Sequence, residues 1–175
     1  RILRAVDGVS FQIRQGETLG VVGESGCGKT TLARAVINLI PATGGAVTLL
    51  GTNVTEAEKA SMRALRKDLQ IVFQDPLASL DPRMTIGSSI AEPLLVHRPG
   101  MSAEARDAAV REMMVKVGLA PALINRYPHE LSGGQNQRVG IGRAIILKPK
   151  LVICDEAVSA LDVSIRAQII DLLIE

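Results

Sequence analysis

The chain has 175 residues, of which 47% are hydrophobic and 22% charged, as in a globular domain with one well-buried core. Its 20 Lys and Arg residues nearly balance 18 Asp and Glu residues, which argues against a nucleic-acid or membrane-surface footprint. The only aromatic residues are Phe11, Phe73 and Tyr127, too few for a platform on which bases could stack.

The cysteines and the termini indicate the cellular setting. Cys27 and Cys154 do not form a disulfide framework, no signal peptide is evident, and no apolar run approaches the ~20 residues of a membrane helix. We therefore expect a cytosolic protein. The chain begins at Arg1 without Met and stops at Glu175 inside an apolar helical pattern, so we expect a fragment of something longer.

The first part of the chain predicts alternating strands and helices. Residues 9–14 alternate as a strand does, Gly16 marks a turn, and the apolar run 19–22 predicts a buried parallel strand. Next come a helix over 30–40 stopped by Pro41, a strand over 46–50, a helix from a Thr55–Glu58 capping box to about Arg66, and a strand over 69–73.

The remainder predicts a helical insertion followed by a return to the sheet. Six prolines interrupt residues 75–130, where the clearest element is a helix over roughly 102–117. One face of that helix carries Val110, Met113, Met114 and Val117, and we interpret its methionines as core residues. Then follow a helical stretch over 131–147, a strand over 151–154 and a last helix that Asp162 could cap. This pattern predicts an α/β core with a helical subdomain.

A glycine-rich loop follows the predicted strand 19–22 and opens the predicted helix 30–40. Its residues GESGCGKT, 23–30, fit the pattern G-x-x-x-x-G-K-[ST] of a phosphate-binding loop. Lys29 would reach the β- and γ-phosphates of ATP, and the Thr30 hydroxyl would ligate Mg²⁺. A plain glycine-rich turn is the alternative, but such a match arises by chance in roughly one chain in a hundred of this length. Cys27 occupies a variable position, where a small side chain is favoured over a redox role.

The predicted ATP-binding residues of this loop are Gly23, Glu24, Ser25, Gly26, Cys27, Gly28, Lys29, Thr30 and Thr31.

Two carboxylates end the predicted strand 151–154. Asp155 is predicted to hold Mg²⁺, and Glu156 to orient or deprotonate the attacking water. Alone, such a pair is more often a solvated turn, but a phosphate-loop enzyme needs this partner. Gln74, where the strand 69–73 meets the insertion, could touch Mg²⁺ and report whether the γ-phosphate is present.

A second glycine-rich loop, LSGGQ at 131–135, lies at the start of a predicted helix and is therefore another anion cradle. The chain has one obvious catalytic carboxylate pair, so the second cradle is best explained as serving a nucleotide on a different subunit. This arrangement implies two chains paired head to tail across ATP. The alternative is a simple glycine-rich helix cap.

The set GESGCGKTT, Gln74, LSGGQNQR, LVICDE and SALD resembles the ATP-binding subunit of ABC transporters over nearly the whole chain. More narrowly, 72–94 and 154–164 look like the oligopeptide/dipeptide/nickel importer subfamily. The resemblance implies a P-loop NTPase core, with a RecA-like parallel sheet and N-terminal antiparallel strands, and a helical subdomain. Within a single truncated nucleotide-binding domain, 1–74 and 148–175 would form the core and 75–147 the subdomain with the signature motif.

The resemblance also assigns roles to individual residues. Thr30, Gln74 and Asp155 would hold Mg²⁺, and Glu156 would be the catalytic base. The ATP of a second subunit would be bound by Ser132, Gly133, Gly134, Gln135 and Asp162.

The function implied is ATP hydrolysis that powers a peptide-type importer at the cytoplasmic face of the membrane. The partners would be a second ATP-binding subunit, identical or related, and permease subunits touching residues near 75–95. An external substrate-binding protein would act indirectly, and no nucleic acid is involved. The alternatives are a non-transport ABC ATPase and a nucleotide-binding fragment that does not hydrolyse ATP alone. No residue of this sequence identifies the transported substrate.

Three departures from the family pattern concern single positions. Asn136 is unusual within LSGGQxQR, although the position is a tolerant one. The switch histidine of the family would follow a later strand, so His97 and His129 are interpreted as ordinary residues. The aromatic side chain that stacks on adenine would precede residue 1. The chain by itself is therefore expected to be impaired in hydrolysis.

Overall fold

The computed structural model describes residues 4–157 and 161–174. It divides into two compact units, residues 1–66 and residues 67–175, and each is described by itself. No helix within the described residues is long and apolar enough to cross a membrane. The predicted division into 1–74 with 148–175 and 75–147 stays a prediction.

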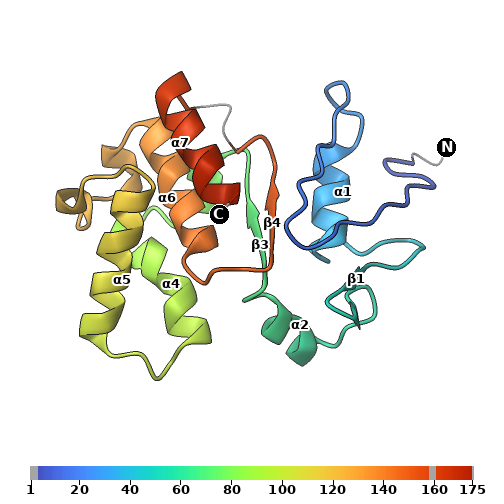
Figure 1. The fold of residues 1–175 in the computed structure, drawn as a ribbon, viewed down its shortest axis with the longest axis horizontal. Helices are drawn as coiled ribbons and strands as arrows, with labels where there is room; N and C mark the ends of the chain where they lie inside the picture. Colours follow the sequence, from blue (N-terminus) through green and yellow to red (C-terminus); the bar gives the residue numbers. More distant parts are fainter. Residues whose placement is uncertain (1–3, 158–160, 175) are drawn as a thin grey trace. The chain divides into compact units, whose positions relative to one another are not determined.

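The first unit contains two helices and a hairpin (Figure 1). They are α1 (Lys29–Val36), β1 (Thr48–Leu49), β2 (Thr52–Asn53) and α2 (Lys59–Leu65). β1 pairs antiparallel with β2, and the two turn residues, Leu50 and Gly51, have φ of 48° and 81°. Two successive positive φ values are typical of the tight turn that suits the twist of a hairpin. The predicted strand over 46–50 is confirmed in shortened form. The return strand was not predicted, because leucine is rare in this conformation.

Two predicted strands are wrong. Residues 9–14 and 19–22 form no strand, although the turn at Gly16 is present with φ of 77°. A strand exists only as one side of a hydrogen-bonded ladder, and the described residues of the first unit pair only β1 with β2. Alternation and apolar content therefore identified exposed segments that have no strand partner among the described residues.

Both helices of the first unit differ from prediction at one end. α1 ends at Val36 instead of continuing to Ile40, because Asn38 adopts a left-handed φ of 52°. α2 begins at Lys59, and the predicted capping box at Thr55 is wrong. The Thr55 hydroxyl is bonded within the hairpin region, where it accepts from the Val47 N–H at 3.3 Å and donates to Asn53 Oδ1.

The second unit contains a parallel strand pair. β3 (Leu69–Val72) pairs with β4 (Leu151–Cys154), and the register aligns Leu69 with Leu151 and Val72 with Cys154. Both strands were predicted. Because the strands are parallel and end at the same level, the residues that follow them meet at one edge of the sheet.

Helices α4, α5 and α6 of the second unit lie on one side of the β3–β4 pair (Figure 1). The elements are α3 (Pro76–Ser79), α4 (Ile86–His97), α5 (Ala103–Lys116), η1 (Pro121–Leu123), η2 (Pro128–Glu130), α6 (Gly133–Ile145) and α7 (Val163–Ile174). The predicted helices over 102–117 and 131–147 are confirmed. α4 was not predicted, because Pro93 lies in its interior and obscures the helical pattern.

The core of the second unit lies between α4, α5 and α6. Its buried members include Ile86, Ile90, Leu94, Val110, Met114, Val117, Val139 and Ile141. Met114 has no exposed surface, which confirms its predicted role as a core residue. At Gly142, a Cβ atom would stand 3.3 Å from Met113 Cγ, so this glycine lets α5 and α6 approach closely.

Candidate functional site

The predicted phosphate loop forms the entry to α1. Gly26 and Gly28 have φ of 78° and 101°, and a Cβ atom at Gly28 would collide with the Ala5 carbonyl oxygen. Among the described residues, no side chain caps the start of α1. A helix start without a side-chain cap suits an anion, because the helix dipole favours negative charge at this end.

The Lys29 ammonium group lies inside this loop. Its Nζ donates to the Gly23 carbonyl at 2.8 Å and to the Glu24 carbonyl at 2.9 Å. Cys27 Sγ is 3.9 Å from the same nitrogen. One positive charge and a helix N-terminus thus lie within residues 23–31, the set predicted to bind the ATP held by the same chain. This donor set fits a polyphosphate.

The ends of β3 and β4 carry the predicted catalytic residues. The Asp155 N–H donates to the Val72 carbonyl at 3.0 Å, so Asp155 continues the ladder, and the residue is buried at 8% exposure. Gln74 Nε2 donates to Glu156 Oε2 at 2.7 Å. The structure therefore brings Gln74 and Glu156 into direct contact, next to Asp155, although they are 82 positions apart in the sequence.

Glu156 has an unusual backbone conformation for a residue with a side chain. Its φ is 52°, in the left-handed region that glycine usually occupies. Such a conformation costs on the order of 1–3 kcal/mol and is typically found at functional sites. Together with the bond from Gln74, it gives the Glu156 carboxylate a defined position at the sheet edge.

The second glycine-rich loop forms the start of α6. Ser132 Oγ accepts from the Gln135 N–H at 3.2 Å, and Gln135 Oε1 accepts from the Ser132 N–H at 2.9 Å. This reciprocal capping box explains the serine and the glutamine locally. It does not explain Gly133, which has neither a positive φ nor any atom within 4 Å of the place of a Cβ. No contact or backbone angle among the described residues requires a glycine there.

Asn136 is a buried residue of this helix. It is 1% exposed, and its Nδ2 donates to the Pro128 carbonyl at 2.9 Å. The interpretation of this position as tolerant within the family stays a prediction, whereas in this chain the side chain joins the first turn of α6 to η2.

Replacing Asn136 with alanine should lower the free energy of unfolding by about 1 kcal/mol, because the Pro128 carbonyl loses its donor in a buried place. The loss of stability is limited because the substitution also removes Asn136 Oδ1, a buried oxygen with no hydrogen-bond partner among the described residues. Urea unfolding measures the change. Gln168→Ala on the exposed side of α7 is the control, and equal stability of the two variants would contradict the expectation.

The last predicted residue, Asp162, caps α7. Its Oδ1 accepts from the Ile165 N–H at 3.0 Å, as the sequence predicted. Ser159 and Ala160 of the SALD motif lie outside the described residues. The Mg²⁺ set of Thr30, Gln74 and Asp155 stays a prediction, since Thr30 belongs to the other unit. No cluster of three or more His, Cys, Asp or Glu side chains suited to a metal occurs in the described part of the chain.

Two side chains at this site were not predicted. Gln137 and Arg143 of α6 donate to the backbone at the two ends of segment 73–79, which contains Gln74. Gln137 belongs to the quoted motif LSGGQNQR, which was a sequence signal for its importance but not for its contact, and no motif included Arg143. Burial lowers the pKa of the Arg143 guanidinium, and the charge of Glu92 opposes this effect.

The comparison with protein families decides the identity. The family model described as "ABC transporter" matches residues 6–159. The chain belongs to the ABC transporter family. Among curated proteins of this family, it is 61% identical to the oligopeptide transport ATP-binding protein OppF of Escherichia coli (strain K12), over 99% of the chain and 52% of that protein. It is 51% identical to a putative oligopeptide transport ATP-binding protein, YkfD of Bacillus subtilis (strain 168), over 99% of the chain and 53% of that protein.

Solved structures of ABC cassettes agree with this assignment. A dimeric post-hydrolysis state of the ATP-binding cassette MJ0796, bound to ADP and Pi, superposes with a TM-score of 0.90 at 30% identity. The match covers 97% of the chain and 73% of that cassette. The predicted fold class, a P-loop NTPase core with a helical subdomain, and the resemblance to peptide-type importers are confirmed. The chain spans about half the length of the curated oligopeptide transport relatives it matches.

Proposed function

We propose that the chain is part of the ATP-binding and ATP-hydrolysing subunit that powers an oligopeptide or dipeptide ABC importer. The observation that carries the hydrolytic part is the contact of Gln74 with Glu156 at the ends of two parallel strands, beside the buried Asp155. The proposal that the importer transports peptides rests on the 61% identity to an oligopeptide transport ATP-binding protein.

In this proposal the phosphate loop binds ATP and Glu156 acts on water. Lys29 and the N–H groups of the first turn of α1 neutralise the phosphate charges. The Glu156 carboxylate, oriented by Gln74, accepts a proton from the attacking water. Thr30, Gln74 and Asp155 offer the oxygen ligands that Mg²⁺ prefers, and bound Mg²⁺ would neutralise charge that develops on the phosphates.

The proposed assembly is a head-to-tail pair of ATP-binding subunits. In it, the α6 start of one copy, with Ser132, Gly133, Gly134 and Gln135, contacts the γ-phosphate of ATP held by the other, and Asp162 couples the two sites. The unexplained Gly133 supports this arrangement, because a residue without a side chain lets a ligand approach the backbone closely. The MJ0796 cassette, a dimer bound to ADP and Pi, is similar over 97% of the chain.

The proposed location is the cytoplasmic face of the membrane, bound to permease subunits that contact residues near 75–95. Co-purification tests this placement against the alternative of a non-transport ABC ATPase. The full-length polypeptide should sediment with membranes that contain its permease and be released when the permease is deleted. Association with ribosomes or DNA instead would contradict the transport role and leave the ATPase role in place.

A further inference from the structure

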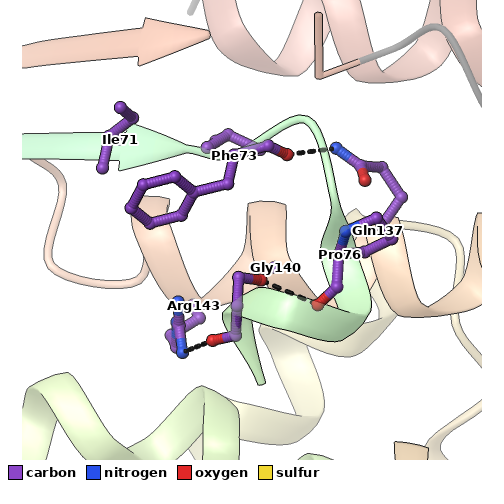
Figure 2. A pocket seen from close by; sticks show the side chains of 8 residues that line it. Ile71, Phe73, Pro76, Gln137, Gly140 and Arg143 are labelled. Atoms are coloured by element: carbon purple, nitrogen blue, oxygen red, sulfur yellow. Dashed lines mark hydrogen bonds between the residues drawn. The ribbon is translucent and has the colours of Figure 1, made fainter. Parts of the chain in front are cut away.

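Helix α6 holds both ends of the segment that carries Gln74. Gln137 donates to the Phe73 carbonyl at 3.3 Å (Figure 2). Arg143 donates to the Ser79 carbonyl at 2.7 Å. Gly140 lies between the two donors on α6, and it lines one pocket together with Gln137 and Arg143. Segment 73–79 is therefore hydrogen-bonded to α6 on both sides of Gln74.

Gln137 is not explained by packing. Its side chain is 1% exposed, and its Oε1 has no hydrogen-bond partner among the described residues. An unpaired buried amide oxygen is unfavourable, so an apolar side chain of equal length would suit packing better. The feature that requires an amide at this place is the donation from Nε2 to Phe73.

The Phe73 carbonyl belongs to the peptide group that contains the Gln74 nitrogen. Holding this carbonyl therefore fixes the direction in which the chain leaves β3 and presents Gln74 to Glu156, 2.7 Å away. We propose that Gln137 is a positioning residue that aligns the Gln74–Glu156 pair through the Phe73 carbonyl. Since α6 begins at Gly133, a displacement of the LSGGQ turn would reach this pair through the same helix. The inference rests on the proposed role of Glu156.

The test replaces Gln137 with methionine, which has nearly the same length but no donor. In the full-length polypeptide, kcat for ATP hydrolysis should fall roughly tenfold to a hundredfold, because a small misplacement of a catalytic group has an effect of this size. The KM for ATP should be unchanged, and the thermal unfolding temperature should fall only by the small amount expected for the loss of one hydrogen bond. Gln137→Leu is the second apolar variant if the methionine variant does not fold.

The matched control is Gln168→Met. Gln168 is an exposed residue of α7 that also donates to a backbone carbonyl, that of Lys116 at 3.4 Å, away from Gln74. Its kcat should stay within about twofold of wild type, as expected for a surface change. An equal loss of kcat in both variants would overturn the inference.

A double-mutant cycle separates positioning from a general structural role. If Gln137 acts through Gln74, Gln137→Met should reduce kcat little further in a Gln74→Ala background, because coupled residues are not additive. Full additivity of the two changes would overturn the inference.

Hydrogen exchange distinguishes failure of this inference from failure of the proposed function. Backbone amides within 73–79 should exchange faster in Gln137→Met than in Gln168→Met, and equal exchange would overturn the inference. If the wild-type protein hydrolyses ATP and Gln137→Met hydrolyses it at the same rate, the inference about Gln137 is overturned. The proposed function then remains intact. A wild-type protein that does not hydrolyse ATP would overturn the proposed function, and exchange then decides whether Gln137 positions Gln74.

Discussion

Replacing Glu156 with glutamine should lower kcat for ATP hydrolysis at least about 100-fold, the lower range for loss of a general base. Glutamine keeps an oxygen that can accept the Gln74 donation, so the local geometry should persist. ATP binding should remain, because the phosphate contacts of the loop are unchanged. Steady-state phosphate release and a fluorescent ATP titration, both on the full-length polypeptide, measure the two effects. Size exclusion with ATP should show a trapped dimer.

The control for this variant is Glu112→Gln on α5. Glu112 pairs with Lys116 at 2.8 Å on an exposed helix surface, so it matches the charge change without touching the site. It should hydrolyse ATP at the wild-type rate. A Glu156→Gln protein that also hydrolyses ATP at that rate would remove Glu156 from the mechanism and direct the search to another base.

Replacing Lys29 with alanine should weaken ATP binding itself. The loss of a charge-assisted contact corresponds to roughly 1.5–3 kcal/mol, which raises Kd about 10- to 100-fold. Folding should be nearly unaffected, because the Gly23 and Glu24 carbonyls that Lys29 contacts lie in an exposed loop and can bond to water. Isothermal titration with ATP measures the change.

Lys59→Ala is the matched control for Lys29→Ala. Lys59 is an exposed lysine at the start of α2 in the same unit, outside the phosphate loop. Its Kd for ATP should equal that of wild type. Unchanged affinity in Lys29→Ala would contradict the assignment of residues 23–31 as the ATP-binding loop.

The sequence predicted best where several residues constrained one element. β3, β4, α5 and α6 have apolar patterns, caps or flanking prolines that agree with one another, and the structure confirms each of them. The prediction was wrong over 9–14 and 19–22, because a strand depends on a partner that local pattern does not supply. α4 was missed for the opposite reason, since Pro93 disfavours a helix that tertiary packing of Ile86, Ile90 and Leu94 nevertheless stabilises.

The sequence predicted which residues belong to the candidate site, but it did not predict the contacts between them. Motif spacing identified Lys29, Gln74 and Glu156, because phosphate binding and proton transfer demand particular residue types at strand ends. The bond from Gln74 to Glu156 required the parallel register of β3 and β4, which no single segment encodes. Gln137 stands in the quoted motif LSGGQNQR, but its proposed positioning role was not predicted, because that role depends on its contact with the Phe73 carbonyl.

Disulfide trapping between two copies is the most direct test that they share ATP. Cys27 is exposed in the phosphate loop, and His129 is exposed three residues before Ser132, outside the residues proposed to contact the γ-phosphate. In full-length Glu156→Gln protein carrying His129→Cys and Cys154→Ala, oxidation with ATP should give a covalent dimer. Without ATP, or with Cys27→Ala added, that dimer should be absent. A protein that stays monomeric with ATP, or that dimerises equally without Cys27, would contradict the head-to-tail account.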